Sequence, residues 1–313
     1  PDFEVPADTD ANNAYIVEVT ATDGAAADIH VPSTAFPTIQ SAIDGASAGD
    51  VIRVAAGTYT ENIWIADNDA ANISVIGAGP GKSIIDGNGG RAVTFYKRYD
   101  NGGTLSGFTI QNGDHSQGGA VYISRCNNPV LTNLVVSGNK GELGVIFINR
   151  GSPTLDHVTV VNNENTAGKV LKGAIYTEQD SACVLTNSII WGNTGVASYG
   201  QLNGSSTGGS STITVSYSIF PTSSGGVVDA GNNINADPLV DANFGMALNS
   251  ESPAIDAGSD ADMGAIFSDG PLSDVQTLTV TVTDVFENAA PVFTSADAVD
   301  AAENQVVAAT VIA

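Results

Sequence analysis

Short runs of alternating apolar and polar residues return at a regular interval along the middle of the chain. They read SGFTIQNG, TNLVVSGN, DHVTVVNN, TNSIIWGN and, more loosely, SYSIF, and they begin at Ser106, Thr132, Asp156, Thr186 and Ser216. The interval is therefore 24 to 30 residues. Alternation over so few residues is typical of β-strands with one buried face. This parity predicts which side chains point inward: Phe108, Ile110, Leu134, Val136, Val158 and Val160.

A second series of strand-like runs accompanies the first. It reads RAVTFYKRY, GGAVYISRCN, GVIFINRGS and GAIYTEQDS, beginning at Arg91, Gly118, Gly144 and Gly173. Here the parity points Val121, Ile123, Ile146 and Ile148 inward. Short turns containing Pro129, Pro153 and Cys183 separate the second series from the first. Each period thus holds two or three short strands separated by Gly, Asn and Pro turns.

Such a period predicts an all-β fold in which each repeat is one coil of a parallel β-helix. A single coil cannot bury its own apolar face, so stacking of neighbouring coils must do so. Strands of neighbouring coils should lie about 4.8 Å apart. Equivalent residues then form columns, and Asn139, Asn163 and Asn193 share one column at a turn. We expect their amides to form a ladder that satisfies turn backbone groups.

The open end of a β-helix exposes strand edges and core, and it needs a cap. Ile39, Ala42 and Ile43 lie at helical spacing in the segment Phe36 to Ile65, and they predict a short capping helix at the N-terminal end. Cys126 and Cys183 fall two coils apart in different columns, so we expect two thiols rather than a disulfide.

The composition limits the partners. The net charge is -24 with only ten basic residues, and the sequence pI is about 4.1. Nucleic-acid binding needs basic patches, so nucleic acid is excluded as a partner. An acidic chain of this kind fits an extracellular, high-salt or calcium-binding setting. No apolar run is long enough to span a membrane.

An aromatic column suggests a carbohydrate-binding face. Alignment of the second series places Tyr122, Phe147 and Tyr176 in one column, with Thr94 in the coil before. Because their neighbours point inward, these rings are expected to point outward, where a polysaccharide can stack on them. Tyr96 joins the same carbohydrate-binding candidates. The alternative is that the stacked rings only stabilise neighbouring strands.

A basic column lies beside the aromatic one. Lys97, Arg125 and Arg150 share it, at the ends of strands. Three neighbouring cations repel one another, so one interpretation is that acids such as Asp100 or Glu142 lie between them. The other is that the column binds carboxylates or sulfates of an acidic polysaccharide.

A second outward column contains Asn133, His157 and Asn187, with Trp191 near it. This column is another candidate for sugar contact. A single histidine there is equally compatible with an ordinary surface position, because no His/Cys cluster with zinc spacing accompanies it.

Three segments resemble a known superfamily. The segment Phe36 to Ile65, the run ISVIGAGPGKSIIDG from Ile73 and the GGAV and SGN repeats are similar to right-handed parallel β-helices of the pectate-lyase-like superfamily and of bacterial polymorphic outer-membrane proteins. The segment Asn233 to Ile266 resembles the end module of such surface proteins. The similarity runs from about Ile29 to Phe267, and residues 25–271 are interpreted as the β-helix. It implies the fold more strongly than any activity.

The superfamily includes lyases that cleave uronate polymers by β-elimination. If this chain were one, Lys97 and Arg125 would act as base and acid, with His115 as a further candidate. No RxPxxR-like lyase signature, paired-aspartate glycosidase motif or QDT esterase motif is present. The sequence therefore favours a non-catalytic, polysaccharide-binding module of a secreted bacterial adhesin. A uronate lyase and a structural spacer are the alternatives.

The two ends of the chain resemble cadherin-like repeats, which are antiparallel sandwiches. Residues 1–24 and 272–289 resemble two parts of one repeat, carried by IVEVTATDG and LSDVQTLTVTVTDV, and residues 290–313 resemble the start of the next. The β-helix would then be an insertion in a hairpin loop, at a kind of site that tolerates insertion.

This second resemblance implies calcium as a cofactor. Asp8 and Asp10 match the family's DRE motif, and Asp284, Glu287 and Asn288 match its DxNDN linker motif. Calcium prefers six to eight oxygen ligands of this kind. Phe286 replaces an expected Asn, and other ligands of the motif fall outside the chain, so an incomplete site is expected.

Overall fold

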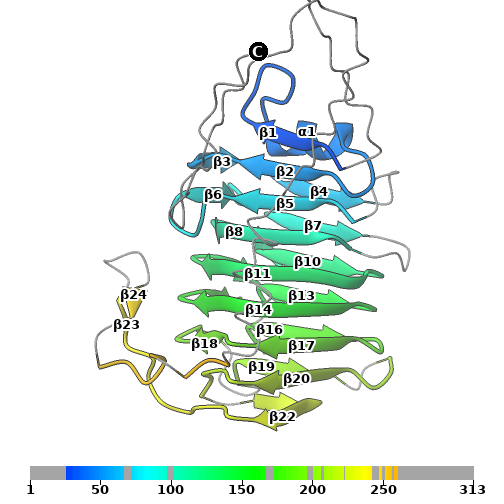
Figure 1. Cartoon of the computed structure of the whole chain (residues 1–313). Helices are drawn as coiled ribbons and strands as arrows, with labels where there is room; N and C mark the ends of the chain where they lie inside the picture. Colours follow the sequence, from blue (N-terminus) through cyan, green and yellow to red (C-terminus); the bar gives the residue numbers. More distant parts are fainter. Residues whose placement is uncertain are drawn as a thin grey trace, which may run out of the picture. The chain divides into compact units, whose positions relative to one another are not determined.

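The computed structural model describes residues 26–66, 72–96, 102–166, 173–195, 200–205, 208–221, 223–241, 247–248, 251–255 and 257–259. Within them the chain winds into stacked coils of parallel β-strands (Figure 1). The predicted all-β fold, a parallel β-helix with one short helix, is confirmed. The cadherin-like segments of residues 1–24, 272–289 and 290–313 lie outside the described residues.

Three faces of the coil are formed by parallel sheets. The first sheet contains β1 (Asp28–Val31), β2 (Val51–Val54), β5 (Ser74–Gly77), the leading halves of β8 (Thr104–Gln111), β11 (Asn127–Ser137) and β14 (Ser152–Val161), and then β17 (Ala182–Thr186), β20 (Thr212–Ser216) and β22 (Val227–Gly231). The second sheet contains β3 (Gly57–Thr60), β6 (Ser83–Asp86), the trailing halves of β8, β11 and β14, and β18 (Ile189–Trp191).

The third sheet is formed by the strands of the second sequence series. It contains β4 (Ile63–Ala66), β7 (Val93–Tyr96), β10 (Val121–Ser124), β13 (Ile146–Asn149), β16 (Ile175–Glu178), β19 (Leu202–Gly204) and β21 (Ser223–Gly225). Three two-residue strands join the second sheet to the third: β9 (Asp114–His115), β12 (Lys140–Gly141) and β15 (Glu164–Asn165). After the coils, β23 (Val240–Asp241) and β24 (Ala247–Leu248) form a small antiparallel pair.

In five successive coils a single left-handed residue bends the chain from the first sheet into the second. These residues are Gly107, Asn133, His157, Asn187 and Tyr217, with φ values of 77°, 50°, 52°, 50° and 49°. Glycine adopts this conformation at little cost, and asparagine and histidine do so more often than most residues, whereas Tyr217 is unusual there. The bend explains why β8, β11 and β14 are long strands that belong to two faces of the coil.

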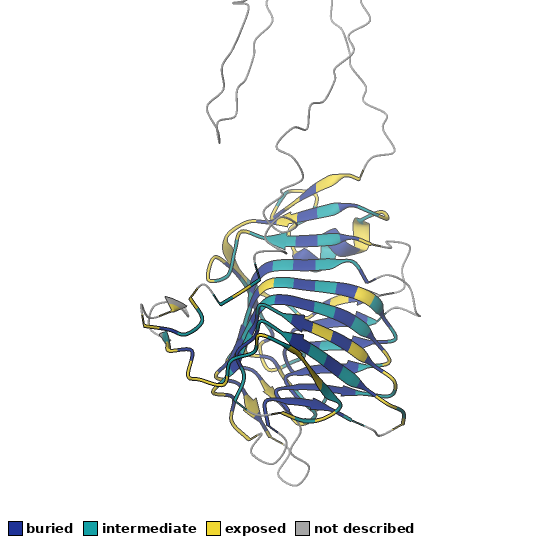
Figure 2. Cartoon of the chain, turned by 60° about the horizontal axis from the view of Figure 1, so that its bottom comes forward, coloured by how far each residue is buried: buried dark blue, intermediate teal, exposed yellow. Residues whose placement is uncertain are grey.

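The core lies inside the coils, as the alternation predicts. Every side chain predicted to point inward in the two series is at most 1% exposed. Figure 2 shows buried residues recurring at equivalent places from coil to coil. The burial of these apolar side chains is the main favourable contribution to folding.

The predicted asparagine ladder is confirmed. Asn163 Nδ2 donates to Asn193 Oδ1 at 2.8 Å and to the carbonyls of Val136 and Val161 at 2.9 and 3.0 Å. Its Oδ1 accepts from both the backbone N–H and the Nδ2 of Asn139, at 2.9 and 3.0 Å. All three asparagines are buried. The ladder therefore supplies hydrogen-bond partners for backbone N–H and C=O groups at the turn that are buried away from solvent.

The N-terminal cap is also confirmed. α1 (Ile39–Gly45) buries Ile39, Ala42 and Ile43 and packs on β1, β2 and β4. The Gln40 amide accepts from the N–H of Trp64 and donates to its carbonyl, at 2.7 and 3.1 Å. The Glu61 carboxylate accepts from the first two N–H groups of the helix. A side chain thus takes the place of a further strand at the edge of β4.

The two cysteines are as expected. Cys126 and Cys183 are buried and form no disulfide. Burial raises the pKa of Cys183 to about 12, which keeps it a thiol at neutral pH.

The ladder predicts a large loss of stability on replacement of its central member. We expect Asn163→Ala to lower the free energy of unfolding by about 3 kcal/mol, because it leaves several buried backbone groups unsatisfied. Urea denaturation followed by circular dichroism measures this loss. Asn235→Ala, at an exposed asparagine, is the control and should change stability little. Equal losses in the two variants would contradict the role assigned to the ladder.

Candidate functional site

The register of the third sheet confirms the predicted aromatic column. Tyr122 pairs with Phe147, Phe147 pairs with Tyr176, and Thr94 pairs with Tyr122. The Tyr122 and Phe147 ring centroids are 5.4 Å apart at 19°, and those of Phe147 and Tyr176 are 5.5 Å apart at 11°. The rings form a continuous stack outside the main core.

The expectation that this column offers its rings to a sugar is wrong for Phe147 and Tyr176. Phe147 is 0% exposed and Tyr176 is 1% exposed. The backbone at Gly118 lies against Phe147, and that at Gly144 lies against Tyr176, where an added Cβ would approach to 3.2 and 3.1 Å. The connections into the third sheet thus fold over its outer side. The stacked rings stabilise neighbouring coils, which was the alternative interpretation.

A polar column runs beside the rings. The register aligns Tyr96, Ser124, Asn149 and Glu178. Asn149 Nδ2 donates to Glu178 Oε1 at 2.8 Å, and the Tyr176 hydroxyl donates to Glu178 Oε2 at 3.2 Å. Half-buried Tyr96, one of the carbohydrate-binding candidates, accepts through its hydroxyl from Arg125 Nη1 at 3.3 Å. This column presents hydroxyl, amide and carboxylate groups along successive coils.

The predicted arginine column follows at the carboxyl end of the same strands. Arg125, Arg150 and Gln179 have φ values of 52°, 56° and 56°, and so the three occupy the same kind of turn in successive coils. Coil-to-coil bonds hold them: Arg125 N–H donates to the Asn149 carbonyl at 3.0 Å and Arg150 N–H to the Glu178 carbonyl at 3.3 Å. Lys97, predicted as the third cation, lies outside the described residues.

No acid interleaves with these two arginines in the part of the chain that the structure describes. Neither guanidinium forms an ion pair there. Of the acids expected to separate the cations, Asp100 lies outside the described residues and exposed Glu142 makes no ion pair with either arginine. Among the described residues, the two guanidinium groups therefore carry no carboxylate partner.

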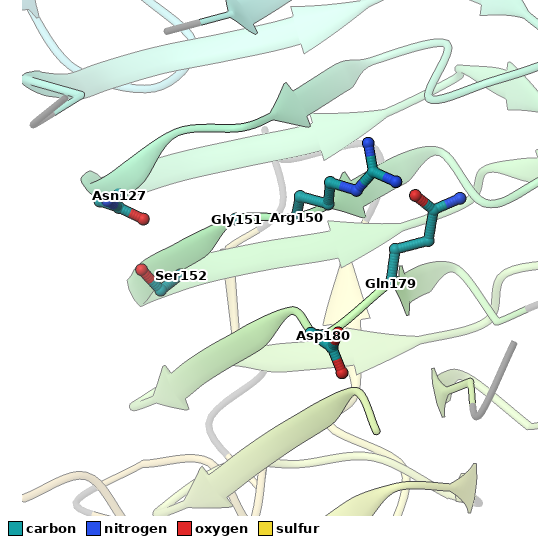
Figure 3. A pocket seen from close by; sticks show the side chains of 6 residues that line it. All are labelled: Asn127, Arg150, Gly151, Ser152, Gln179 and Asp180. Carbon is teal, nitrogen blue, oxygen red and sulfur yellow. The ribbon is translucent and has the colours of Figure 1, made fainter. Parts of the chain in front are cut away.

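An open pocket of about 280 Å³ lies at this turn. Its lining consists of Asn127, Arg150, Gly151, Ser152, Gln179 and Asp180. In Figure 3 the Arg150 and Gln179 side chains extend to the same side of the ribbon, and Asn127 and Ser152 lie together at the start of the next strands. Asp180 Oδ1 accepts from the Ser210 N–H at 2.8 Å, so it is engaged within the fold.

A third arginine lies at the amino-terminal end of the strands of the third sheet, opposite to the arginine column. Arg91 Cζ is 4.4 Å from the centroid of the Tyr122 ring. Arg91 Nε donates to the Gln117 carbonyl at 3.0 Å, and Nη2 donates to His115 Nδ1 at 3.0 Å. Sequence reasoning singled out His115 and Tyr122 but missed Arg91, because Arg91 falls outside the basic column and reaches Tyr122 from the preceding coil.

His115 is neutral in this arrangement. Its Nδ1 also accepts from the Gln117 N–H at 3.0 Å, which fixes the tautomer with the proton on Nε2. Burial and the adjacent Arg91 lower the pKa of His115. The ring therefore lies beside a cation without adding a second positive charge.

A separate polar cluster lies at the bend between the first and second sheets. Asp156 accepts from His157 Nδ1 at 2.8 Å, from Thr186 Oγ1 at 2.8 Å and from Asn187 Nδ2 at 2.9 Å. Burial opposes ionisation, but these hydrogen bonds outweigh it and lower the pKa of Asp156. Asn187 Oδ1 also accepts from the Ser259 N–H, which attaches the later segment to the coils.

The metal prediction is not tested by this structure. Asp8, Asp10, Asp284, Glu287 and Asn288 lie outside the described residues. In the described ranges, no group of three or more His, Cys, Asp and Glu side chains is arranged to hold a metal ion. No described helix is long and apolar enough to cross a membrane.

Known proteins offer limited comparison. No family model and no curated protein matches the sequence. Among solved structures, the chain is similar to a pectin methylesterase from carrot, with 16% identity, a TM-score of 0.41, and coverage of 71% of this chain and 80% of that one. For the Aspergillus niger pectin methylesterase the values are 14%, 0.39, 69% and 85%, and for PemA of Erwinia chrysanthemi they are 12%, 0.32, 67% and 81%. At these TM-scores the similarity assigns no activity to this chain.

The Asp156 cluster predicts a specific pH dependence of stability. Since its pKa is lower in the folded than in the unfolded chain, its contribution is present above pH ~4 and is lost as the pH falls through the folded pKa. We expect Asp156→Asn to lower the free energy of unfolding at pH 7 by about 2 kcal/mol, because charged hydrogen bonds are lost.

Urea denaturation of both proteins between pH 7 and pH 3 checks this expectation. The difference between wild type and variant should shrink as the pH falls below 4. A difference that stays constant over this range would show that the ionised form of Asp156 is not the stabilising one.

Proposed function

We propose that this chain binds an anionic polysaccharide at the arginine column of Arg125 and Arg150, without turning it over. The observation that supports the proposal most directly is the column itself. Two guanidinium groups on neighbouring coils occupy equivalent left-handed turns and have no carboxylate partner in the described part of a chain with a net charge of -24.

The spacing suits a polymer. Strands of neighbouring coils lie about 4.8 Å apart, so the two arginines repeat along the axis of the β-helix. A chain that carries carboxylates at intervals can neutralise both. Each guanidinium can bind a carboxylate through two parallel hydrogen bonds, which a lysine cannot.

Neighbouring polar groups can recognise sugar hydroxyls. Asn127, Ser152 and Gln179 line the pocket with Arg150, and Tyr96 holds Arg125 through a hydrogen bond. Because the aromatic column is largely buried, we assign recognition to hydrogen bonds and charge rather than to ring stacking. Phe147 and Tyr176 therefore leave the set of sugar-contacting residues, while half-buried Tyr122 stays within it.

The hydrogen bonds of the Glu178 carboxylate agree with a binding role for this face. Glu178 accepts from Asn149 and Tyr176, so its oxygens are engaged in holding the coils together. A role as adhesin outside the cell, with calcium bound by the cadherin-like ends, extends this proposal and rests on the sequence resemblance alone.

Replacement of either arginine should weaken binding. We expect Arg150→Gln and Arg125→Gln each to weaken the affinity for polygalacturonate or alginate roughly tenfold at low salt, because each removes a charge-assisted pair. The affinity of the wild type should also fall as salt rises. Isothermal titration calorimetry measures both effects, and absorbance of unsaturated product in the same samples reports any lyase activity.

Arg53→Gln is the matched control, because Arg53 is paired with Asp28 on the first sheet and its loss removes the same charge. Its affinity should equal that of the wild type. Equal weakening in all three variants would show that binding depends on the net charge of the protein and not on the arginine column. Unsaturated product that accumulates with time would replace the binding proposal with a lyase.

A further inference from the structure

Arg91 is a half-buried cation whose contacts in the described structure include no anion. It stacks on Tyr122, donates to a backbone carbonyl and donates to a neutral imidazole. Burial lowers the pKa of Arg91, although a guanidinium remains charged at any physiological pH. By contrast, Arg53 and Lys140, away from this sheet, are each paired with a carboxylate.

The position of Arg91 follows from the register of the third sheet. The ring column holds Thr94 in the coil before Tyr122, and threonine is too small to continue the stack. Phe147 stacks on Tyr122 from the following coil, and Arg91 comes from the preceding one. The guanidinium therefore covers the other face of Tyr122, in the place where a further ring would lie. Cation–π contact and two hydrogen bonds fix its orientation.

Part of the guanidinium has no acceptor among the described residues. It has five N–H donors, of which Nε and one N–H of Nη2 are used. Nη1 makes no hydrogen bond to any described residue. Nη1 and the second N–H of Nη2 form the end of the fork, which matches the two oxygens of a carboxylate. A carboxylate at this end of the fork would form a charge-assisted pair with the guanidinium.

We propose that Arg91, held by Tyr122, His115 and Gln117, is a second anion subsite that takes a carboxylate of the polysaccharide. This rests on the proposed function for the identity of the polymer but uses different residues. Its neutral His115 avoids repulsion with Arg91, and the exposed acids Asp114 and Glu142 near His115 oppose only part of the lowering of its pKa. Since these acids repel an anion more strongly the more charge it carries, the subsite is assigned to one carboxylate rather than to a cluster of charges.

Arg91 and Arg125 lie at opposite ends of the strands of the third sheet, and the distance between these ends sets the minimum length of the ligand. Arg91 precedes β7 and Arg125 follows β10, and the four residues of β10 span about 13 Å. A ligand that reaches both arginines must therefore be an oligomer with carboxylates on more than one residue. A single uronic acid can occupy only one of the two positions.

The chain has three histidines. Since only one of them contacts Arg91, their NMR signals can distinguish binding at this subsite from binding elsewhere. We would record the imidazole NMR signals of the full chain during titration with oligogalacturonates of increasing length, with sulfated dextran and with neutral dextran. His115 contacts Arg91, whereas His157 lies at the bend and His30 on the first sheet. We expect a saturable shift of His115 alone, at lower concentration for longer oligogalacturonates.

Variants separate this subsite from the arginine column. In Arg91→Gln the His115 shift should need at least tenfold more ligand or disappear, and in Arg150→Gln it should persist. Unchanged His157 and His30 signals would show that Arg91→Gln is folded. Should the glutamine variant misfold, Arg91→Lys, which keeps the charge but loses the fork, should still weaken the response.

Other outcomes overturn the proposal. A silent His115 while calorimetry detects binding would reject the subsite and leave the arginine column standing. A shift that persists in Arg91→Gln, that neutral dextran reproduces, or that all three histidines share would also reject it. A His115 response with no effect of Arg125→Gln or Arg150→Gln would support the subsite and reject the column.

Discussion

The hydrogen bonds between the backbones of neighbouring coils are the interaction on which the rest of the structure depends. In this fold a strand finds its partners one turn away, so equivalent residues of successive coils are brought into register. Side chains of one kind then form columns. The buried amides of Asn139, Asn163 and Asn193, the stacked rings and the two arginines are three results of this one constraint, with different chemistry at different places on the coil.

Columns were predictable from the sequence because the register is fixed by the repeat. Alignment identified the column of Tyr122, Phe147 and Tyr176, the inward side chains and the asparagine ladder. The helical spacing of Ile39, Ala42 and Ile43 indicated the capping helix. Exposure was not predictable in the same way. Whether an outward ring meets water depends on the connections before each strand, and Gly118 and Gly144 let these connections lie against Phe147 and Tyr176.

Arg91 illustrates a second limit of sequence reasoning. Column analysis compares residues at the same place in the repeat, whereas Arg91 acts three positions before its column and reaches the ring of the next coil. The sequence signal was the small residue Thr94 in an otherwise aromatic column, with a long side chain nearby. The bend cluster of Asp156 and His157 was likewise seen only as a column of outward residues, because hydrogen bonds between neighbours in different coils require side-chain geometry.

The cap on the first coil affects how one molecule can meet another. A parallel β-helix has no intrinsic length, since each coil presents to the next the same unsatisfied groups that it has just satisfied. At β4 the amide of Gln40 imitates a peptide group and occupies the donor and acceptor of Trp64. One short helix and one glutamine therefore end the third sheet at β4. The same stacking that builds coils within one molecule would, at an uncapped edge, join one molecule to another.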